Sequence, residues 1–402
     1  MNRPGAQRAA QVPDGMIVVN GYSEGWLRKG FDWVYPAEVT AGRATPGQVV
    51  RLQSASGDVL GTAIADEGWI AARRFRDDAG PIDGALLDAR VRAAHDLRQR
   101  VLRGAGDTRA YRLVNGENDD LPGIRVDVWA AHLVVSLDSP SLLGLLDPLV
   151  DSLAFLRPES VHLAFRPDPR DRDRVWPRPP GLVRGADPGD VVVTERGLSF
   201  LVTPGAGSKD VGLFPDMRDN RAWLEPHWQG RTLLNLFAHT CAFSVFAAKA
   251  GATTVSVDLS PHYLERGAAN FRLNGLDPQE LLAEDAFKAL DRFRRTGRHF
   301  DVVILDPPGH SHGKDGAWSG EQDYARLVAA ALRVLVPGGW LVAASNLGSV
   351  SPHRFQGMLL DGARRSGHTL RLLHDGQQAP DFPASLDFPE GRYLKFMVCA
   401  AT

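Results

Sequence analysis

Three aspartates stand at the ends of short apolar runs in the second half of the sequence, where a ligand-binding or catalytic carboxylate is expected. They are Asp258, Asp285 and Asp306. Because the carboxyl ends of parallel strands meet at one edge of a sheet, these carboxylates are predicted to surround a single crevice. A solvated strand-end acid would explain Asp258 alone, whereas three such acids in succession favour a binding site. In such a site Asp258 suits ribose hydroxyls, and Asp285 suits an adenine amino group.

The turn before the strand that ends at Asp258 indicates which nucleotide-type ligand fits the crevice. It reads Phe237-Ala-His-Thr-Cys-Ala-Phe243 and contains no glycine. A dinucleotide such as NAD requires a glycine-rich turn, because its pyrophosphate must approach a helix N-terminus closely. S-adenosylmethionine carries no phosphate and tolerates side chains in this loop. The sequence therefore favours S-adenosylmethionine as the cofactor.

The segment Asp306-Pro307-Pro308 is the candidate reacting centre. Its two prolines fix the backbone after a buried strand, which aims carbonyl groups and the Asp306 carboxylate into the crevice. Methyltransferases that act on planar nitrogens commonly use such a turn to hold the nitrogen in line with the sulfonium methyl group. The reaction then depends mainly on positioning, because the sulfonium is already a good leaving group.

The elements around these residues predict a doubly wound α/β sheet of seven strands. Buried strand-like runs alternate with helical runs, in the pattern of successive βαβ units. The predicted strands are Thr232–Phe237, Thr253–Val257, Leu281–Ala283, Asp301–Leu305, Trp340–Ala344, Thr369–His374 and Tyr393–Cys399, the last two antiparallel. The helix Glu321–Leu335 is expected to stop at Pro337-Gly-Gly339.

Three domains are expected along the chain. Residues 16–80 alternate short strands with turns, which predicts a small β-barrel. Within it, Gly25–Tyr35 mixes aromatic and basic residues as a nucleic-acid surface does, although a barrel core with solvated charges explains this composition equally well. Residues 81–200 contain an arginine-rich helix and a strand-strand-helix-strand module, so an α+β domain is expected there. Residues 201–402 then form the domain that holds the crevice.

The composition is that of an ordinary folded, soluble chain. It has 44% hydrophobic and 23% charged residues and a net charge of −2, which argues neither for nor against a nucleic-acid partner. Two cysteines exclude a disulfide framework and a cysteine-based zinc site, and no metal is expected. No apolar run approaches the roughly 18–20 residues of a membrane-spanning helix. Because Met1–Gly15 also lacks an apolar signal region, a cytoplasmic enzyme is the default expectation.

Four segments carry a resemblance to a known family, and they are Tyr111–Asp127, Leu213–Arg221, Asp306–Pro308 and Pro389–Lys395. On these segments the chain resembles bacterial class I methyltransferases of 23S rRNA. Such enzymes join an N-terminal PUA domain, a small α/β linker domain and a Rossmann-like catalytic domain. The resemblance implies S-adenosylmethionine as the cofactor and 23S rRNA as the partner. The cofactor-binding residues that follow from it and from the crevice are Asp216, Arg218, Asn235, Phe237, His239, Thr240, Cys241, Phe243, Asp258, Leu259, Asp285, Ala286 and Asp306.

The atom that is methylated separates two branches of this family. The three-domain architecture resembles the cytosine-C5 members, which attack the base with a cysteine thiolate placed after the fifth strand. Here the corresponding run, Ala343–Gly348, has no cysteine, and Cys241 and Cys399 lie elsewhere. Asn346 cannot replace a thiolate, so C5 methylation by the usual route is not expected. The pair Ser345-Asn346 resembles the guanine-N7 members, whose target nitrogen needs only orientation.

The leading hypothesis is an S-adenosylmethionine-dependent methyltransferase that acts on a base of 23S rRNA, at a nitrogen such as guanine N7. Its predicted catalytic residues are Asp306, Pro307 and Asn346, although Asn346 could equally cap the loop in which it stands. Its predicted RNA contacts are Arg28, Lys29, Arg73, Arg74 and Lys314, the last also explained as a solvated loop lysine. The alternatives are cytosine-C5 methylation, or a catalytically degenerate RNA-binding assembly factor that keeps the fold without turnover. A homodimer is left open.

Overall fold

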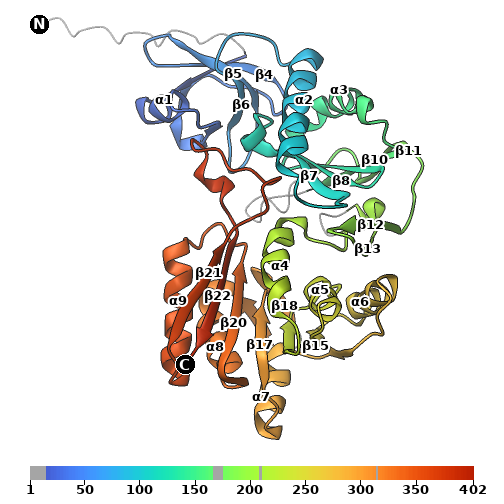
Figure 1. Cartoon of the computed structure of the whole chain (residues 1–402). Coiled ribbons are helices and arrows are strands. Elements are labelled where there is room, and N and C mark those ends of the chain that lie inside the picture. The colour runs from blue at the N-terminus through green and yellow to red at the C-terminus, as the bar shows by residue number, and fades with distance from the viewer. Residues whose placement is uncertain (1–14, 166–174, 208–210, 314–315) are drawn as a thin grey trace, which may run out of the picture.

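Three large sheets, of six, five and seven strands, follow one another along the described part of the chain, which also has two two-stranded hairpins (Figure 1). The computed structural model describes residues 15–165, 175–207, 211–313 and 316–402, and it describes no side chains for residues 310–317. The first two sheets lie together, and the third sheet, with helices on both faces, lies below them in the view of Figure 1. The predicted mixed α/β class is confirmed. No helix among the described residues is long and apolar enough to cross a membrane.

The first sheet has the strand order β2-β6-β5-β4-β1-β3. Its strands are β1 (Met16–Val19), β2 (Trp33–Val34), β3 (Val39–Ala41), β4 (Val49–Gln53), β5 (Val59–Ala65) and β6 (Ala72–Arg76). Helix α1 (Gly21–Leu27) begins at Asn20, whose side chain accepts the Ser23 N–H at 2.9 Å, and it buries Leu27 in the core of this sheet. The two edge strands, β2 and β3, do not pair with each other, so strand pairing among the described residues does not close a barrel.

The second sheet has the strand order β11-β10-β9-β8-β7. It comprises β7 (Ala110–Asn115), β8 (Ile124–Trp129), β9 (His132–Leu137), β10 (Ser160–Phe165) and β11 (Gly181–Gly185). Helices α2 (Gly84–Val101) and α3 (Leu146–Ser152) share its hydrophobic core. The hairpin of β12 (Val191–Glu195) and β13 (Leu198–Val202) then packs against this sheet and against the domain that follows. The expected domain boundary at residue 200 therefore falls inside β13.

The third sheet carries the predicted crevice. Its order is β16-β15-β14-β17-β20-β22-β21. Its strands are β14 (Thr232–Leu236), β15 (Thr253–Asp258), β16 (Glu280–Ala283), β17 (Phe300–Leu305), β20 (Leu335–Ser345), β21 (Leu370–Gly376) and β22 (Lys395–Ala401). Only β22 is reversed, since it pairs antiparallel with both β20 and β21, whereas both last strands were expected to be reversed. The chain winds in opposite directions on the two sides of β14, so the switch point for a ligand lies at its carboxyl end.

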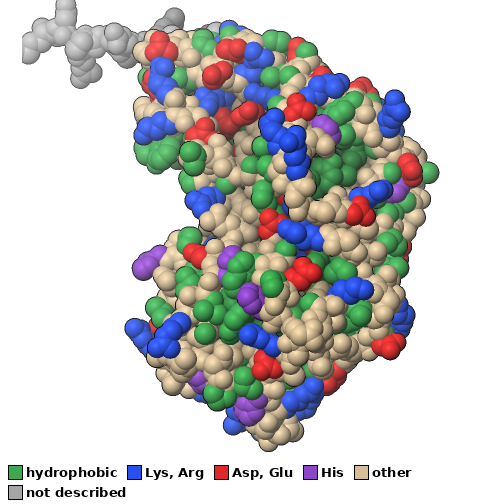
Figure 2. Space-filling view, viewed as in Figure 1, with side chains coloured by type: hydrophobic (Ala, Val, Ile, Leu, Met, Phe, Trp, Pro, Cys, Tyr) green, Lys and Arg blue, Asp and Glu red, His purple; other side chains and the backbone are tan. Residues whose placement is uncertain are grey.

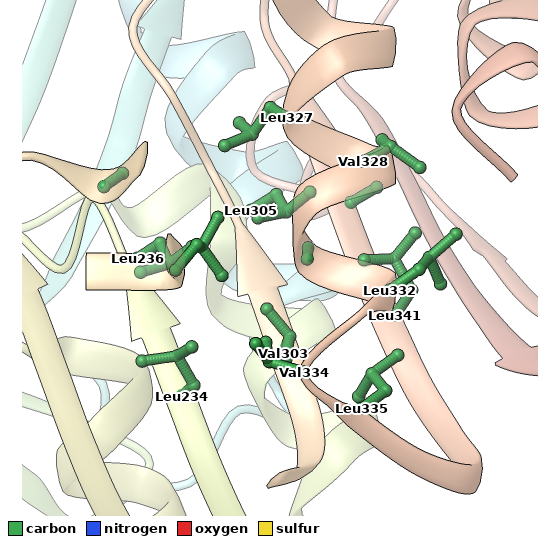
Figure 3. Close-up of a cluster of buried hydrophobic side chains, with 14 of the residues drawn as sticks. Leu234, Leu236, Val303, Leu305, Leu327, Val328, Leu332, Val334, Leu335 and Leu341 are labelled. Carbon is green, nitrogen blue, oxygen red and sulfur yellow. The ribbon is translucent and has the colours of Figure 1, made fainter. Parts of the chain in front are cut away.

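Helices cover both faces of the third sheet. One face packs against α4 (Arg218–Leu224), α5 (Ala242–Lys249) and α6 (Pro261–Leu273), and the other against α7 (Ala286–Thr296), α8 (Gly320–Leu332) and α9 (Pro352–Ser366). Figure 3 shows the second face, where Leu305 of β17 lies near Leu327 of α8, and Leu234 of β14 and Leu332 of α8 belong to the same buried cluster. Burial of each such side chain contributes about 1.5–3 kcal/mol. This packing fixes the strand ends that carry the site.

The predicted end of the helix before the fifth strand needs one correction. Helix α8 ends at Leu332, and strand β20 already begins at Leu335, so Pro337–Gly339 lies inside the strand. Leu335 pairs with Phe300, and pairing resumes at Trp340 after an irregularity. A proline cannot donate to a strand ladder, so it is accommodated in this irregular stretch. The rest of β20, from Trp340 onwards, contains the predicted fifth strand Trp340–Ala344 and leads to the crevice.

Candidate active site

The turn between β14 and α5 keeps a glycine-like backbone without glycines. Phe237, His239 and Cys241 have positive φ angles of 60°, 49° and 62°. This left-handed conformation costs a residue that bears a Cβ about 1–2 kcal/mol, so the surroundings must hold it. One restraint is the Asp258 carboxylate, whose Oδ2 accepts the His239 N–H at 2.8 Å. The backbone shape that a cofactor turn needs is thus present despite the missing glycines.

Asp258, the last residue of β15, presents acceptors to the crevice. Its Oδ1 accepts the Ser260 N–H at 2.9 Å while its Oδ2 holds His239. A carboxylate has about four acceptor positions, so each oxygen keeps one for a ligand hydroxyl. Leu259, the next residue, exposes 60% of its surface beside them. Vicinal hydroxyls next to a planar apolar ring are what a nucleoside presents, so this set of groups fits the adenosyl part of S-adenosylmethionine.

Asp285 has a structural function that explains its position. It is the N-cap of α7, where its Oδ1 accepts the N–H groups of Phe287 and Lys288 at 3.0 and 3.1 Å. Ala286, beside it, is buried in the core. The Oδ2 atom of Asp285 has no partner among the described residues, so the predicted contact with an adenine amino group would fall to this atom.

Asp306 follows β17 and has the most strongly altered chemistry of the three acids. Burial raises the pKa of its carboxyl to about 7, and the negative charge of Asp216 contributes to the rise, while Arg221 and His239 oppose it. The Asp216 carboxylate in turn accepts the hydroxyl of Tyr393 at 2.8 Å. Two acids, Asp216 and Asp306, therefore meet at the crevice, and Asp306 changes its charge near neutral pH.

Two aromatic residues that the sequence did not single out support the Asp306 turn. The indole N–H of Trp318 donates to the Pro308 carbonyl at 2.7 Å, and its ring lies 6.2 Å from that of Phe237. The hydroxyl of Tyr324, buried on α8, lies 2.8 Å from the Ala344 carbonyl and 3.2 Å from the Leu305 carbonyl. It thus bridges the ends of β17 and β20. The one sequence feature that could have indicated this support is Trp318 itself, a single tryptophan in the glycine-rich segment before α8.

Asn346 stands directly after β20, at the same edge of the sheet. It is exposed, and its side chain has no hydrogen-bond partner among the described residues. The loop around it is held by other groups, because Ser345 Oγ accepts the Leu347 N–H at 3.4 Å and the Leu347 carbonyl accepts the Val350 N–H at 3.1 Å. The capping alternative for Asn346 therefore has no contact to support it. Its amide remains available to a ligand.

Four predicted cofactor residues have partners within the protein. The pairs are Arg218 with Asp381, Asn235 with Ser244, Thr240 with the Gly212 carbonyl, and Phe243 with Phe396. Arg218 and Asn235 are 1% and 2% exposed, so their polar groups face the interior. We assign these four side chains to the support of the turn and sheet, because each already contacts a neighbour inside the protein. Pro307 is buried beneath the Asp306 turn, as its predicted positioning role requires.

The predicted RNA contacts divide into buried and exposed groups. Arg73 pairs with Asp66 and Glu117 between the first two sheets, and Arg74 donates to Asp32 and to backbone carbonyls. Both guanidinium groups are buried, so we assign them a structural role in place of an RNA contact. The other two predicted residues of the first sheet, Arg28 and Lys29, are exposed at the end of α1. Lys314 lies outside the described residues.

Neither cysteine is placed to act as a nucleophile. Burial raises the pKa of Cys241 to about 12 and that of Cys399 to about 11, and a thiolate is the reactive form. The Cys241 sulfur also packs against Gly267 of α6. If Gly267 carried a side chain, its Cβ would lie 2.5 Å from this sulfur. Among the described residues, no group of three or more His, Cys, Asp or Glu side chains could hold a metal ion.

The fold and this site define a methyltransferase that uses S-adenosylmethionine. The sheet has a switch point at β14, a carboxylate with acceptor positions at Asp258, and an Asp-Pro-Pro turn at the end of β17. A family model described as S-adenosylmethionine-dependent methyltransferase matches residues 183–395. The chain belongs to this family, and S-adenosylmethionine is its cofactor.

Relatives with curated names extend the match over most of the chain. A protein of Vibrio cholerae named ribosomal RNA large subunit methyltransferase I is 32% identical over 386 residues, which are 93% of this chain and 96% of that protein. The protein of the same name from Shewanella amazonensis is 33% identical over 378 residues, 91% and 94% of the two chains. A crystal structure of a putative methyltransferase with S-adenosylhomocysteine shares the fold, with a TM-score of 0.86, 24% identity and coverage of 96% and 99%.

Proposed function

We propose that this chain transfers the methyl group of S-adenosylmethionine to a base of 23S rRNA, at a ring nitrogen such as guanine N7. The names of the relatives from Vibrio cholerae and Shewanella amazonensis support the choice of large-subunit rRNA. The choice of nitrogen rests on one observation, which is that the crevice has no thiolate. Both cysteines of the sequence are buried thiols with raised pKa values, whereas guanine N7 has a lone pair in the plane of the ring and needs no covalent activation.

In this proposal the protein contributes orientation. Bound S-adenosylmethionine supplies an activated methyl group, and Asp306 and Asn346 hold the base so that its nitrogen points at that methyl group. The Asp306 carboxylate accepts N–H groups of the base edge, and the exposed Asn346 amide donates to an acceptor on the same base. Pro307 keeps the carboxylate in place by fixing the backbone. Correct alignment of two reactants alone can supply a large part of the rate enhancement.

The three predicted domains give the rest of the chain a role in delivering RNA. We assign residues 16–80 to a PUA-like RNA-binding domain, residues 81–202 to an α+β linker domain, since the expected boundary at residue 200 moves to the end of β13, and residues 203–402 to the methyltransferase domain with its seven-stranded sheet. Figure 2 shows the surface hollowed between the first of these and the third. Exposed Arg28 and Lys29 stand beside exposed Trp26, with Lys29 Nζ 5.2 Å from its ring centroid, which suits a phosphate next to a stacked base. An rRNA substrate also implies a cytoplasmic location.

Nucleoside mass spectrometry of 23S rRNA methylated in vitro tests the modified atom. The proposal predicts 7-methylguanosine, or another ring-nitrogen product, from the wild-type protein. The Cys241→Ser variant should give the same product at a rate within about twofold, because a buried thiol with a raised pKa is not the nucleophile. Detection of 5-methylcytidine, or loss of activity in Cys241→Ser with the fold intact, would establish the C5 alternative and sink this proposal.

Cofactor binding separates an enzyme from a degenerate assembly factor. Calorimetry should show that the wild-type protein binds S-adenosylmethionine. The Asp258→Ala variant should bind it with an affinity lower by at least about tenfold, because that carboxylate supplies the ribose acceptors. Asp306→Ala should abolish methyl transfer while leaving cofactor affinity within about tenfold, since its task is to position the base. A protein that binds RNA but no S-adenosylmethionine would support the assembly factor instead.

A further inference from the structure

Lys395, the first residue of β22, is buried beside the proposed base-binding loop. It pairs with Ser345 of β20 across the sheet, next to Asn346, and only 4% of its surface is exposed. Its ammonium group donates to the Leu347 carbonyl at 2.5 Å and to the Tyr393 carbonyl at 2.7 Å. The side chain therefore joins the loop after β20 to the start of β22.

The burial of this ammonium without a counter-charge is unusual. No carboxylate among the described residues lies within ion-pair distance of Lys395 Nζ, and burial lowers its pKa to about 8. Lysine is almost never fully buried unless it is paired, because an unpaired buried charge is costly. An apolar side chain of similar length would fill the same space without that penalty. The two carbonyls that Lys395 holds are thus the feature that explains a lysine at this position.

Leu347 is the residue through which Lys395 reaches the site. While Lys395 holds its carbonyl, the Leu347 side chain lies in a notch formed by two glycines. A Cβ on Gly309 would come within 2.5 Å of Leu347 Cδ2, and a Cβ on Gly320 within 2.7 Å of Cδ1. Gly309 directly follows the Asp306–Pro308 turn. Leu347 thus packs against that turn on one side and is bonded to Asn346 on the other.

We propose that Lys395 is a positioning residue, which fixes Leu347 so that the Asn346 amide and the Asp306 carboxyl face the same base. The inference rests on the proposed function, because it takes Asn346 as a base contact. Lys395 itself touches two backbone carbonyls and acts through the loop that they belong to. Without Lys395 the Leu347 carbonyl would keep only the Val350 N–H, a bond within the loop itself, so the loop would lose its hydrogen bond to β22 and could shift relative to the Asp306 turn. Displacement of a base contact by about 1 Å can cost about 100-fold in rate.

The test is a double-mutant cycle on the full chain, with in vitro-transcribed 23S rRNA and methyl-labelled S-adenosylmethionine. Lys395→Met removes the donors and keeps the unbranched stem. We expect kcat to fall by about 10- to 100-fold while the KM and Kd for S-adenosylmethionine stay within about twofold. In an Asn346→Ala background the same substitution should cost less than about threefold, because the contact that Lys395 positions is already absent. The matched control is Lys249→Met, which removes an exposed lysine of α5 that also bonds a carbonyl, and it should leave kcat unchanged.

Three results would overturn the inference. One is a Lys395→Met protein with wild-type kcat. Another is an effect of Lys395→Met that is equally large with and without Asn346, since that would show a general structural role. The third is a wild-type rate in Asn346→Ala, which would refute the base contact of the proposed function as well, whereas the first result leaves that function intact. If Lys395→Met does not fold, Leu347→Ala tests the same link, because it empties the notch at Gly309 and should lower kcat with unchanged cofactor affinity.

Discussion

At the scale of the residue, three strand-end aspartates acquire different chemistry from their surroundings. Asp258 holds two backbone N–H groups, Asp285 caps a helix, and Asp306 is buried beside another acid. The sequence located all three, because an acid after a buried strand is a local pattern. It could not rank them, since the pKa of Asp306 depends first on burial and then on Asp216, a residue of a distant segment, and both follow only from the fold. Lys395 escaped notice for the same reason, because burial of a lysine leaves no mark in the sequence.

The raised pKa of Asp306 predicts that methyl transfer depends on pH near neutrality. Below about pH 7 the carboxyl is protonated and cannot accept two N–H groups of a base, so kcat/KM should rise through about pH 7 and level off above it. Asp306→Asn fixes the neutral form, so its profile should be flat and at least about tenfold lower at the plateau. Rate measurements between about pH 5.5 and 8.5 check this, and a flat wild-type profile would contradict it.

The same group should affect stability in the opposite direction. Its folded pKa of about 7 lies above its ordinary value of 3.8, so the native state binds the extra proton between these values. The stabilisation that protonation provides is therefore complete below about pH 4 and is lost as the pH rises through about 7. Urea denaturation of the wild type should show this loss, and Asp306→Asn should lack that part of the pH dependence.

At the scale of the element, the order of strands and helices followed from the sequence, but the contacts that align their ends did not. Alternation of apolar runs with capping residues such as Ser260-Pro261 placed the helices and strands of the third sheet. Tyr324, in contrast, has the sequence pattern of an ordinary aromatic residue on a helix. Only the folded chain shows that its hydroxyl lies between the Leu305 carbonyl at the end of β17 and the Ala344 carbonyl near the end of β20. Likewise, Pro337 was expected to end the helix because proline commonly follows a helix. The sequence around it does not reveal that Leu335 already pairs with Phe300 of β17 as part of a strand.

Removal of the Tyr324 hydroxyl should therefore disturb both stability and rate. In Tyr324→Phe the Ala344 and Leu305 carbonyls lose a buried donor, which should lower the free energy of unfolding by about 1–3 kcal/mol. The ends of the strands that precede Asp306 and Asn346 would be less well aligned, so kcat should also fall by about tenfold. Denaturant titration and steady-state kinetics measure the two effects. Tyr111→Phe, at a tyrosine without a side-chain hydrogen bond among the described residues, should cost less than about 0.5 kcal/mol.

At the scale of the whole molecule, the segment between β21 and β22 connects all three sheets. This segment, residues 377–394, leaves the crevice edge of the third sheet and rises to the first two (Figure 1). Phe388 stacks on Phe31 of the N-terminal part with ring centroids 5.5 Å apart. Asp381 accepts the Arg112 N–H of β7 at 2.9 Å and pairs with Arg218. This connection could not be predicted from the sequence, because it depends on contacts between residues that lie far apart in the chain, 269 positions for Arg112 and Asp381 and 163 for Arg218 and Asp381.

Asp381 is the residue on which this connection depends, so its charge should matter for the stability of the whole chain. It is fully buried, and Asp381→Asn keeps its shape but leaves the buried Arg218 guanidinium without its direct partner. Breaking a buried ion pair in this way costs about 3–5 kcal/mol. Asp151→Asn removes an exposed partner of Arg184 and should cost less than about 1 kcal/mol. Urea denaturation followed by tryptophan fluorescence compares the two variants, and a loss of less than about 1 kcal/mol in Asp381→Asn would show that the three sheets are held together by other contacts.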